Sequence, residues 1–253
     1  MPVATIRLFL NDTPASEEQL AVFGAIRVDQ GIGVAAEAEL DLPVGTDDGG
    51  AWQLLEDDFA QAFARIRIEV KVGDGEFVAL IDGPVVAQRF DLDATPEASQ
   101  MTLVVHDDSV LMNRDETVVL FEDMSPSDIA SRLFSEAGFE ARVDSVPAAG
   151  SAYTRQVLQR GTPMQLLRRL AREHGFFAYV EPGLTSGRSV GIFQRPLPAD
   201  DALPELVLLG PQRNIGRFTA EFDALRPQAP QAASVLVNDL SAVSSVRAGL
   251  STW

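Results

Sequence analysis

Three runs of neighbouring acidic residues are the first candidates for chemistry in this chain of 253 residues. They are Glu56-Asp57-Asp58, Asp107-Asp108 and Glu122-Asp123. Two carboxyl groups that face each other across a sugar can hydrolyse a glycosidic bond. Side chains adjacent in sequence usually point apart, and a chain with 37 acidic residues contains such runs by chance. We therefore predict that these runs are solvated loop edges and that the chain has no catalytic residue.

The two histidines and the glycine-rich turns offer no better site. His106 precedes Asp107-Asp108 at an expected strand end, but His174 lies 68 residues away and no HxH or HxxE spacing supports a metal. His174 falls in the last turn of an expected helix, where it interacts favourably with the helix terminus. Gly31-Ile32-Gly33 and Gly73-Asp74-Gly75 complete no phosphate-binding motif, and the chain has no cysteine. The sequence predicts no cofactor and no bound metal.

The charge of the chain is strongly negative and unevenly distributed. Its 37 acidic and 20 basic residues give a formal net charge of −17. This argues against a protein that binds nucleic acid or an anionic membrane by neutralising phosphates. Residues 1–126 contain 25 acidic and 7 basic residues, whereas residues 127–253 contain 12 and 13. The asymmetry indicates a domain boundary.

One cationic stripe is present, formed by Arg160, Arg168, Arg169 and Arg172. It has no interleaved aromatic residues on the same face, as a nucleic-acid site would. Two interpretations stay open: a solvated helix face, or a docking surface for the acidic half of a neighbouring subunit.

Alternation of apolar and polar residues predicts strands along the first hundred residues. It is clearest over residues 64–72, where Ile66 and Ile68 share one side and Arg65 and Arg67 the other. The expected strands are residues 3–10, 36–42, 64–72, 76–81, 85–92 and 99–106, with turns at 73–75 and 82–84. Residues 50–63 fit a short helix or an inserted loop. Antiparallel strands with short turns suggest a small barrel or sandwich over residues 1–107.

Residues 108–195 change in character and predict an α+β insert with two capped helices. Ser125 is the expected N-cap of the first helix, with Pro126 at its first position and Gly138 as its stop. Residues 162–165 repeat this helix-start pattern for a second helix, which stops at Gly175. Strands are expected at residues 176–180 and 189–193.

The remainder begins with a linker at residues 196–204. Further strands are expected at residues 205–209, 216–223 and 232–238, with a spacer at 227–231. No basic segment followed by an apolar one opens the chain, and no run approaches about 18 apolar residues. We expect a soluble, unprocessed product.

The stretch from Gln156 to Val180 resembles a signature of contractile-tail hub proteins: a glutamine, a short spacer, a capped helix with an LxRLA pattern, then a glycine and an aromatic strand. This superfamily includes phage late control protein D, the myophage baseplate hub and the hub part of the VgrG proteins of type VI secretion. Residues 124–139 are similar to the preceding helix of the family, and residues 81–85 and 104–107 to the closing hairpins of its first barrel. The structural residues of the motif are Gln156, Thr162, Pro163, Leu167, Leu170, Gly175 and Phe176.

The resemblance implies a β-rich α+β fold in three parts: a tube-type antiparallel β-barrel at residues 1–107, an α+β insert domain at 108–195, and the start of a second tube-like barrel at 196–253. It implies a homotrimer whose two barrels per subunit form a pseudo-sixfold ring. Two features depart from the family. Gln165 stands where an acidic residue is expected, and the second barrel is too short to close. The chain is then a fragment, a compact variant, or completed by a partner.

The function implied is that of a structural baseplate hub, not an enzyme, whose ring joins the sixfold tail tube to the threefold spike. The expected partners are the tail tube and spike proteins, with tape-measure and baseplate wedge proteins as further candidates, and neither sequence-specific nucleic acid nor direct membrane insertion is expected. The hub would be assembled in the host cytoplasm and become part of a virion tail or an injection-machine baseplate. Two alternatives are a tail-associated cell-wall hydrolase and a monomeric adaptor. The acidic residues of the first half either line the lumen or solubilise the free subunit.

Overall fold

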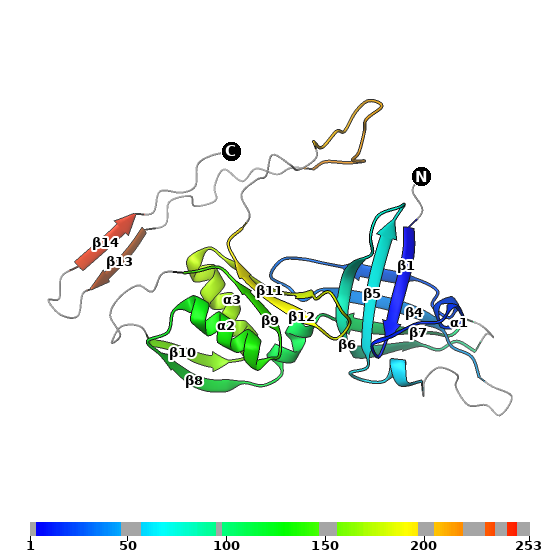
Figure 1. Cartoon of the computed structure of the whole chain (residues 1–253), viewed down its shortest axis with the longest axis horizontal. Coiled ribbons are helices and arrows are strands. Elements are labelled where there is room, and N and C mark those ends of the chain that lie inside the picture. The colour runs from blue at the N-terminus through cyan, green and yellow to red at the C-terminus, as the bar shows by residue number, and fades with distance from the viewer. Residues whose placement is uncertain are drawn as a thin grey trace. The chain divides into compact units, whose positions relative to one another are not determined.

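A computed structural model describes residues 4–46, 57–94, 98–146, 156–196 and 205–219, and the backbone of residues 231–235 and 242–246. The chain divides into two units, Met1–Pro198 and Ala199–Trp253. Strands, mostly antiparallel, and a few helices build the first unit (Figure 1), which confirms the predicted β-rich α+β class.

The first part of this unit is a seven-stranded antiparallel sheet in the order β2-β1-β5-β6-β7-β4-β3. Its strands are β1 (Ala4–Leu10), β2 (Thr13–Pro14), β3 (Ile26–Asp29), β4 (Glu37–Pro43), β5 (Arg65–Val72), β6 (Val78–Asp91) and β7 (Gln100–His106). The predicted alternation therefore identified most of these strands correctly, with β1 paired to β5 along its whole length.

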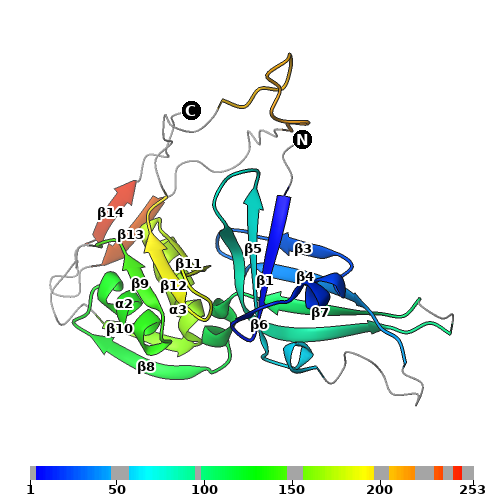
Figure 2. The same cartoon turned by 45° about the vertical axis from the view of Figure 1, so that its right-hand side comes forward.

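The sheet curls around one hydrophobic core (Figure 2). Leu8 of β1, Ile66 of β5 and Leu40 of β4 are fully buried in the same cluster, although β1 and β4 are separated by three strands in the sheet. A short helix, α1 (Glu17–Ala21), and a 3-10 turn, η1 (Asp58–Ala60), lie beside the sheet. Phe23 and Phe59, from the segments around them, pack with ring centroids 5.9 Å apart. Of the predicted helix or loop at residues 50–63, residues 50–56 lie outside the described residues.

The predicted turn at Asp82-Gly83-Pro84 is wrong, because β6 runs straight through it. Gly83 is required there for a close approach. A Cβ at this position would lie 1.9 Å from the carbonyl oxygen of His106 at the end of β7. Pro84 pairs with Arg65 of β5 and precedes the first β7 pair of β6, at Val85. At Gly83-Pro84 the strand β6 therefore passes from pairing with β5 to pairing with β7. Glycine and proline permit this close approach and do not end the strand.

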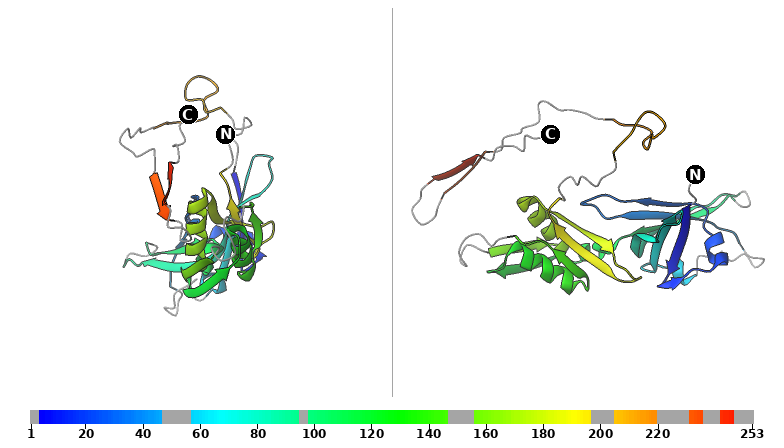
Figure 3. Two further views of the ribbon diagram at one scale, coloured as in Figure 1. Left: turned by 90° about the vertical axis from the view of Figure 1, so that its left-hand side faces the viewer. Right: turned by 45° about the horizontal axis from the view of Figure 1, so that its top comes forward.

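The insert consists of two helices packed between two small sheets (Figures 1 and 3). After a 3-10 helix, η2 (Asp108–Asn113), come β8 (Thr117–Glu122), α2 (Pro126–Glu136), β9 (Glu140–Val143), β10 (Gln156–Gly161), α3 (Pro163–His174), β11 (Phe177–Pro182) and β12 (Ser189–Gln194). One sheet is β10-β8, and the other is β11-β12-β9, with β9 parallel to β12. Phe134 of α2 lies so close to β12 that a Cβ on Gly191 would approach its ring to 2.2 Å.

Both helices of the insert begin and end as predicted. Ser125 and Thr162 are the N-caps, and each forms a capping box with the third helical residue, Asp128 or Gln165. Gly175 takes the left-handed conformation, with φ 68°, at the end of α3, and Gly138 follows α2 with φ 81°.

The second unit holds one described hairpin, in which β13 (Gln231–Val235) pairs antiparallel with β14 (Ala242–Val246). The first agrees with the predicted strand at 232–238 over its described residues. The predicted strand at 205–209 is wrong, as is the described part of 216–223. The side chain of Asn214 accepts a hydrogen bond from the Val207 amide and donates one to the Glu205 carbonyl, so this backbone is held in a loop.

Candidate functional site

A buried cluster of charged side chains lies where the seven-stranded sheet meets the insert. Arg65, Arg67 and Glu69 come from β5, Asp82 from β6 and Asp108 from the start of η2. The alternation along β5 is that of a half-buried strand, yet the Arg67 side chain on its polar side is only 3% exposed. The insert covers this polar face.

A β-bulge brings Asp82 into the cluster. Val70 pairs with Val78, but the register shifts by one residue between Ile68 and Glu69, so Arg67 lies opposite Asp82. An unshifted hairpin would pair Asp82 with Ile66 and turn its carboxylate toward the apolar core. The bulge therefore places a carboxylate beside two arginines.

Each carboxylate in the cluster binds guanidinium groups. Asp82 accepts from Arg65 Nε at 2.8 Å and from Arg67 Nη1 at 3.0 Å. Asp108 accepts hydrogen bonds from both terminal nitrogens of Arg65, at 3.1 and 2.6 Å, which makes a bidentate pair. Glu69 accepts from Arg67 Nε at 2.7 Å and also binds Arg7 of β1.

The loop between β11 and β12 joins the insert to this cluster, and Figure 1 shows that hairpin pointing toward β6. The Gly187 amide donates to Asp82 at 3.1 Å, and the Ser189 hydroxyl donates to Asp108 at 2.6 Å. Ser186 donates to Asp12, just after β1, at 2.8 Å. Residues more than 80 positions apart thus meet at one polar junction.

The charges of the cluster shift its pKa values in different directions. Burial alone would lower the pKa of Arg65, but the hydrogen bonds and charges of Asp108 and Asp82 outweigh it and raise that pKa. Burial likewise opposes ionisation of Glu69, but Arg67 and Arg7 hold its pKa below the ordinary value. Burial raises the pKa of Asp82 despite its arginine partners. With its carboxylates bound to arginines, the cluster is built to hold two parts of the fold together.

The prediction that Asp107-Asp108 is a solvated edge is wrong, since each residue is 3% exposed. Asp107 caps η2 by accepting a hydrogen bond from the Ser109 amide at 2.8 Å. It also accepts a hydrogen bond from the Ala36 amide at 2.5 Å. Burial raises the pKa of Asp107. Because Asp107 and Asp108 serve different partners, they do not form a facing pair. 

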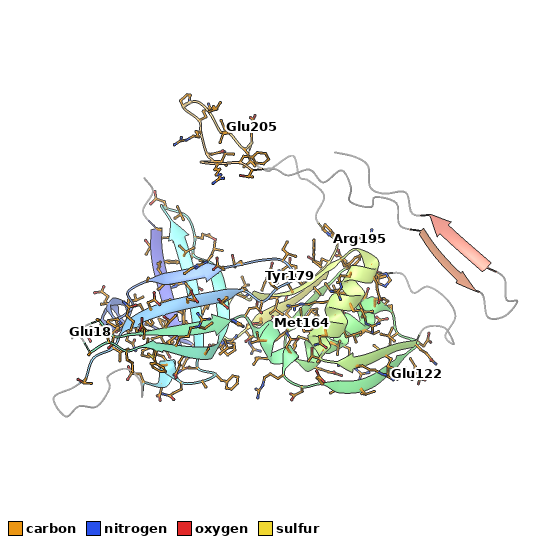
Figure 4. All side chains as sticks on the ribbon, turned by 180° about the vertical axis from the view of Figure 1, so that it is seen from behind. Glu18, Glu122, Met164, Tyr179, Arg195 and Glu205 are labelled. Carbon is orange, nitrogen blue, oxygen red and sulfur yellow. The ribbon has the colours of Figure 1, made fainter. Side chains whose placement is uncertain are left out.

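The other acidic runs are exposed in their described parts, at Asp57, Asp58, Glu122 and Asp123. Glu122 lies at the outer end of β8 (Figure 4). Glu56 lies outside the described residues. His106 Nε2 lies 2.9 Å from a carboxylate oxygen of Glu37, and His174 is exposed at the end of α3. Within the described ranges, no three histidine, aspartate or glutamate residues are grouped to hold a metal ion. None of the described helices is long and apolar enough to cross a membrane.

The motif residues lie in and around α3. Leu167 and Leu170 are buried in the insert core, and Phe176 packs on Phe193 with centroids 5.2 Å apart. Thr162, followed by Pro163 at the first helical position, caps α3 and donates to Asn113 Oδ1 at 2.9 Å. Gly175 ends the helix, and Gln156 is exposed at the start of β10, opposite Glu122.

Comparison with known proteins finds similarity only at the level of structure. No family model and no curated protein matches the chain. A tail protein from Neisseria meningitidis MC58 matches with a TM-score of 0.60 and 15% identity, over 98% of this chain and 68% of that one. The 43 kDa tail protein of prophage MuSo2 from Shewanella oneidensis matches with a TM-score of 0.52 and 15% identity, over 75% of this chain and 53% of that one.

An E. coli component of the type VI secretion system has a TM-score of 0.47 and 11% identity, over 73% of this chain and 48% of its own. The chain thus spans about half the length of the Shewanella protein and about two thirds of the Neisseria protein. At these identities the likeness establishes the fold, which is that of phage tail proteins.

Proposed function

We propose that this chain is a structural component of a contractile tail or injection machine, namely a baseplate hub protein that forms a trimeric ring between tail tube and spike. The observation that carries the proposal is the shared fold with two tail proteins, one of them along 98% of the chain. The division into a barrel at 1–107, an insert at 108–195 and part of a second barrel at 196–253 belongs to the same proposal. Its partners would be the tail tube and spike proteins, with assembly in the host cytoplasm.

The mechanism is assembly, without turnover. In the described part of the chain, β2 pairs only with Phe9 and Leu10, so the outer edge of β1 from Ala4 to Arg7 has no strand beside it. The outer edge of β3 is likewise at the end of the sheet. Open strand edges are templates for pairing with another chain. Burying them in a ring would join subunits and remove a site of aggregation.

A proline at position 6 tests the β1 edge selectively. The Leu8 carbonyl accepts a hydrogen bond from the Ala15 amide, so it points away from β5. Along a strand, the backbone N–H and C=O groups of every second residue point to the same side. The Ile6 amide therefore also points outward. Ile6→Pro removes this donor without touching the β5 ladder, while Ile6→Thr keeps it and serves as the matched control.

The experiment measures mass by light scattering, with and without candidate tail tube and spike proteins. We expect a trimer for the native chain and the threonine variant, and loss of the trimer for the proline variant. A native chain that stays monomeric at high concentration with its tail partners would refute the hub and favour the adaptor. Release of soluble fragments from peptidoglycan by the pure chain would favour the hydrolase.

The place of the acidic residues is a separate question. They could line the lumen, where negative charge keeps DNA or an acidic cargo from sticking, or they could solubilise the free subunit. A structure of the assembled ring decides between these, because acidic residues dispersed over the outer face would contradict the lumen role.

A further inference from the structure

The two-stranded sheet β8-β10 exposes an apolar face. Val118, Leu120 and Leu158 are 75%, 48% and 39% exposed. Leu158 lies opposite Leu120 and Arg160 opposite Val118, so these side chains share one face. The opposite face of the sheet carries Phe121, which is buried in the insert core. Clustered exposed apolar side chains of this kind mark interaction sites.

A cationic groove borders this face between β10 and α3. It encloses about 380 Å³ and is lined by Leu158, Arg160, Gln165, Leu166, Arg169 and Arg172. Arg169 donates to the Leu158 carbonyl at 2.9 Å, and its ion pair with Glu173 is loose, at 3.5 Å. Three arginines therefore stand beside exposed leucine and valine side chains. We call the apolar face and the groove together the β8-β10 surface.

A surface of complementary chemistry lies at the far end of β6. Phe90 and Leu92 are 47% and 54% exposed, and they alternate with Asp91 and Asp93. The hairpin of β6 and β7 extends away from the body of the sheet (Figure 2). We call residues 90–93 the β6 tip.

We propose that the β6 tip of one copy binds the β8-β10 surface of a second copy. The apolar side chains of the tip would cover Val118, Leu120 and Leu158, while Asp91 approaches the arginines of the groove. The occupant is a second copy because the apolar and acidic side chains of the β6 tip complement the apolar and cationic side chains of the β8-β10 surface. Figure 2 places the two at opposite ends of the first unit, so a chain cannot occupy its own surface. Such a contact joins two different surfaces, and repetition of it builds a ring or a filament.

This inference adds a contact to the proposed assembly and uses other residues than the β1 edge. Because the chain contains no cysteine, single cysteines can report it by disulfide formation. One variant carries Leu92→Cys and a differently tagged variant carries Val118→Cys. The matched control replaces Val118→Cys by Leu184→Cys, whose side chain is 98% exposed. All the substituted side chains are exposed, so each variant is expected to fold.

Under mild oxidation, the Leu92→Cys and Val118→Cys chains should form a mixed disulfide about tenfold faster than the control pair, because binding raises the local thiol concentration. Adding Asp91→Arg to the first chain, or Arg160→Glu to the second, should slow the reaction about two- to fivefold each. Combining the two reversals across the interface should restore the rate. An arginine beside a thiol favours the thiolate, so slowing by Asp91→Arg cannot arise from thiol chemistry.

Two outcomes overturn the contact. The first is cross-linking no faster than the Leu184→Cys control, and the second is charge reversals that leave the rate unchanged. If either occurs while the native chain still forms trimers that Ile6→Pro abolishes, the proposed function stands and only the β8-β10 contact fails. Rapid cross-linking of chains that never assemble with tail partners would support the contact and refute the hub.

Discussion

Replacing Arg65 by methionine tests whether the buried cluster holds the insert against the sheet. Arg65 binds Asp82 once and Asp108 twice, and its side chain is 20% exposed. After its removal Asp82 keeps Arg67 and the Gly187 amide, whereas among the described residues Asp108 keeps only the Ser189 hydroxyl. The substitution therefore leaves a buried carboxylate without a cation.

The expected cost follows from that unpaired charge. Removing one partner of a buried ion pair typically costs about 3–5 kcal/mol. Because Arg65 retains some contact with water, we expect Arg65→Met to lower the free energy of unfolding by about 2–4 kcal/mol. The control is Arg27→Met, since Arg27 and Asp29 form a pair that is 70% and 63% exposed. Its effect should stay below about 1 kcal/mol.

A double-mutant cycle identifies the cause. Asp108→Asn removes the charge and keeps an oxygen that can accept the Ser189 hydroxyl, so Arg65→Met/Asp108→Asn should be more stable than the sum of the single effects predicts, by about 1–2 kcal/mol. Urea unfolding followed by circular dichroism supplies these values. If the two effects simply add, or if Arg65→Met costs no more than Arg27→Met, the cluster does not stabilise the junction between the sheet and the insert.

Three further predictions concern single positions. Gly83→Ala should destabilise the sheet by several kcal/mol, because its Cβ would meet the His106 carbonyl at 1.9 Å, whereas Gly24→Ala, with 3.6 Å of clearance, should cost about 1 kcal/mol or less in thermal unfolding. Thr162→Val should lower the free energy of unfolding by about 1 kcal/mol through loss of the α3 N-cap. Thr162→Ser keeps the capping hydroxyl, so this matched control should be as stable as the native chain. Glu69→Gln should lower stability at neutral pH, and the difference should vanish on acidification: the arginines lower the pKa of Glu69 in the fold, so its contribution is present above the ordinary glutamate pKa and is lost as the pH falls through the folded value. A stability difference that persists in acid would refute the ionic origin of this last effect.

The local parts of the fold could be predicted from the sequence because their signals are local. A capping serine or threonine, a proline at the first helical position and a terminal glycine define α2 and α3 within a dozen residues each. The same glycine and proline signals failed at Gly83-Pro84, where their function depends on the end of β7, more than 20 residues later in the chain. Nothing near Gly83 in the sequence distinguishes a close strand crossing from a turn.

The buried cluster could not be predicted from the sequence, for a related reason. The polar side of β5 has the same alternation whether water or the insert covers it, and Asp82 reaches that side only through a one-residue bulge. The only local sign is that both signs of charge occur among Arg65, Arg67 and Glu69 within five residues. Such a mixture is also typical of a solvated strand face, so it does not identify a buried junction.

The cluster also changes how the negative charge bears on assembly. In the cluster, the three carboxylates form ion pairs with three arginines: Glu69, Asp82 and Asp108 with Arg7, Arg65 and Arg67. Elsewhere, residues 1–126 contain 22 acidic and only 4 basic residues.

Of those four basic residues, Arg27 and Arg89 already pair with Asp29 and Glu39. Two first halves brought face to face would therefore repel each other within the Debye length of about 8 Å at physiological ionic strength. Residues 127–195, by contrast, contain 9 basic and 6 acidic residues. Electrostatics thus favours assemblies in which an acidic sheet meets the insert or the near-neutral second unit of another copy, and an alternating ring has that order whereas a symmetric pair of sheets does not.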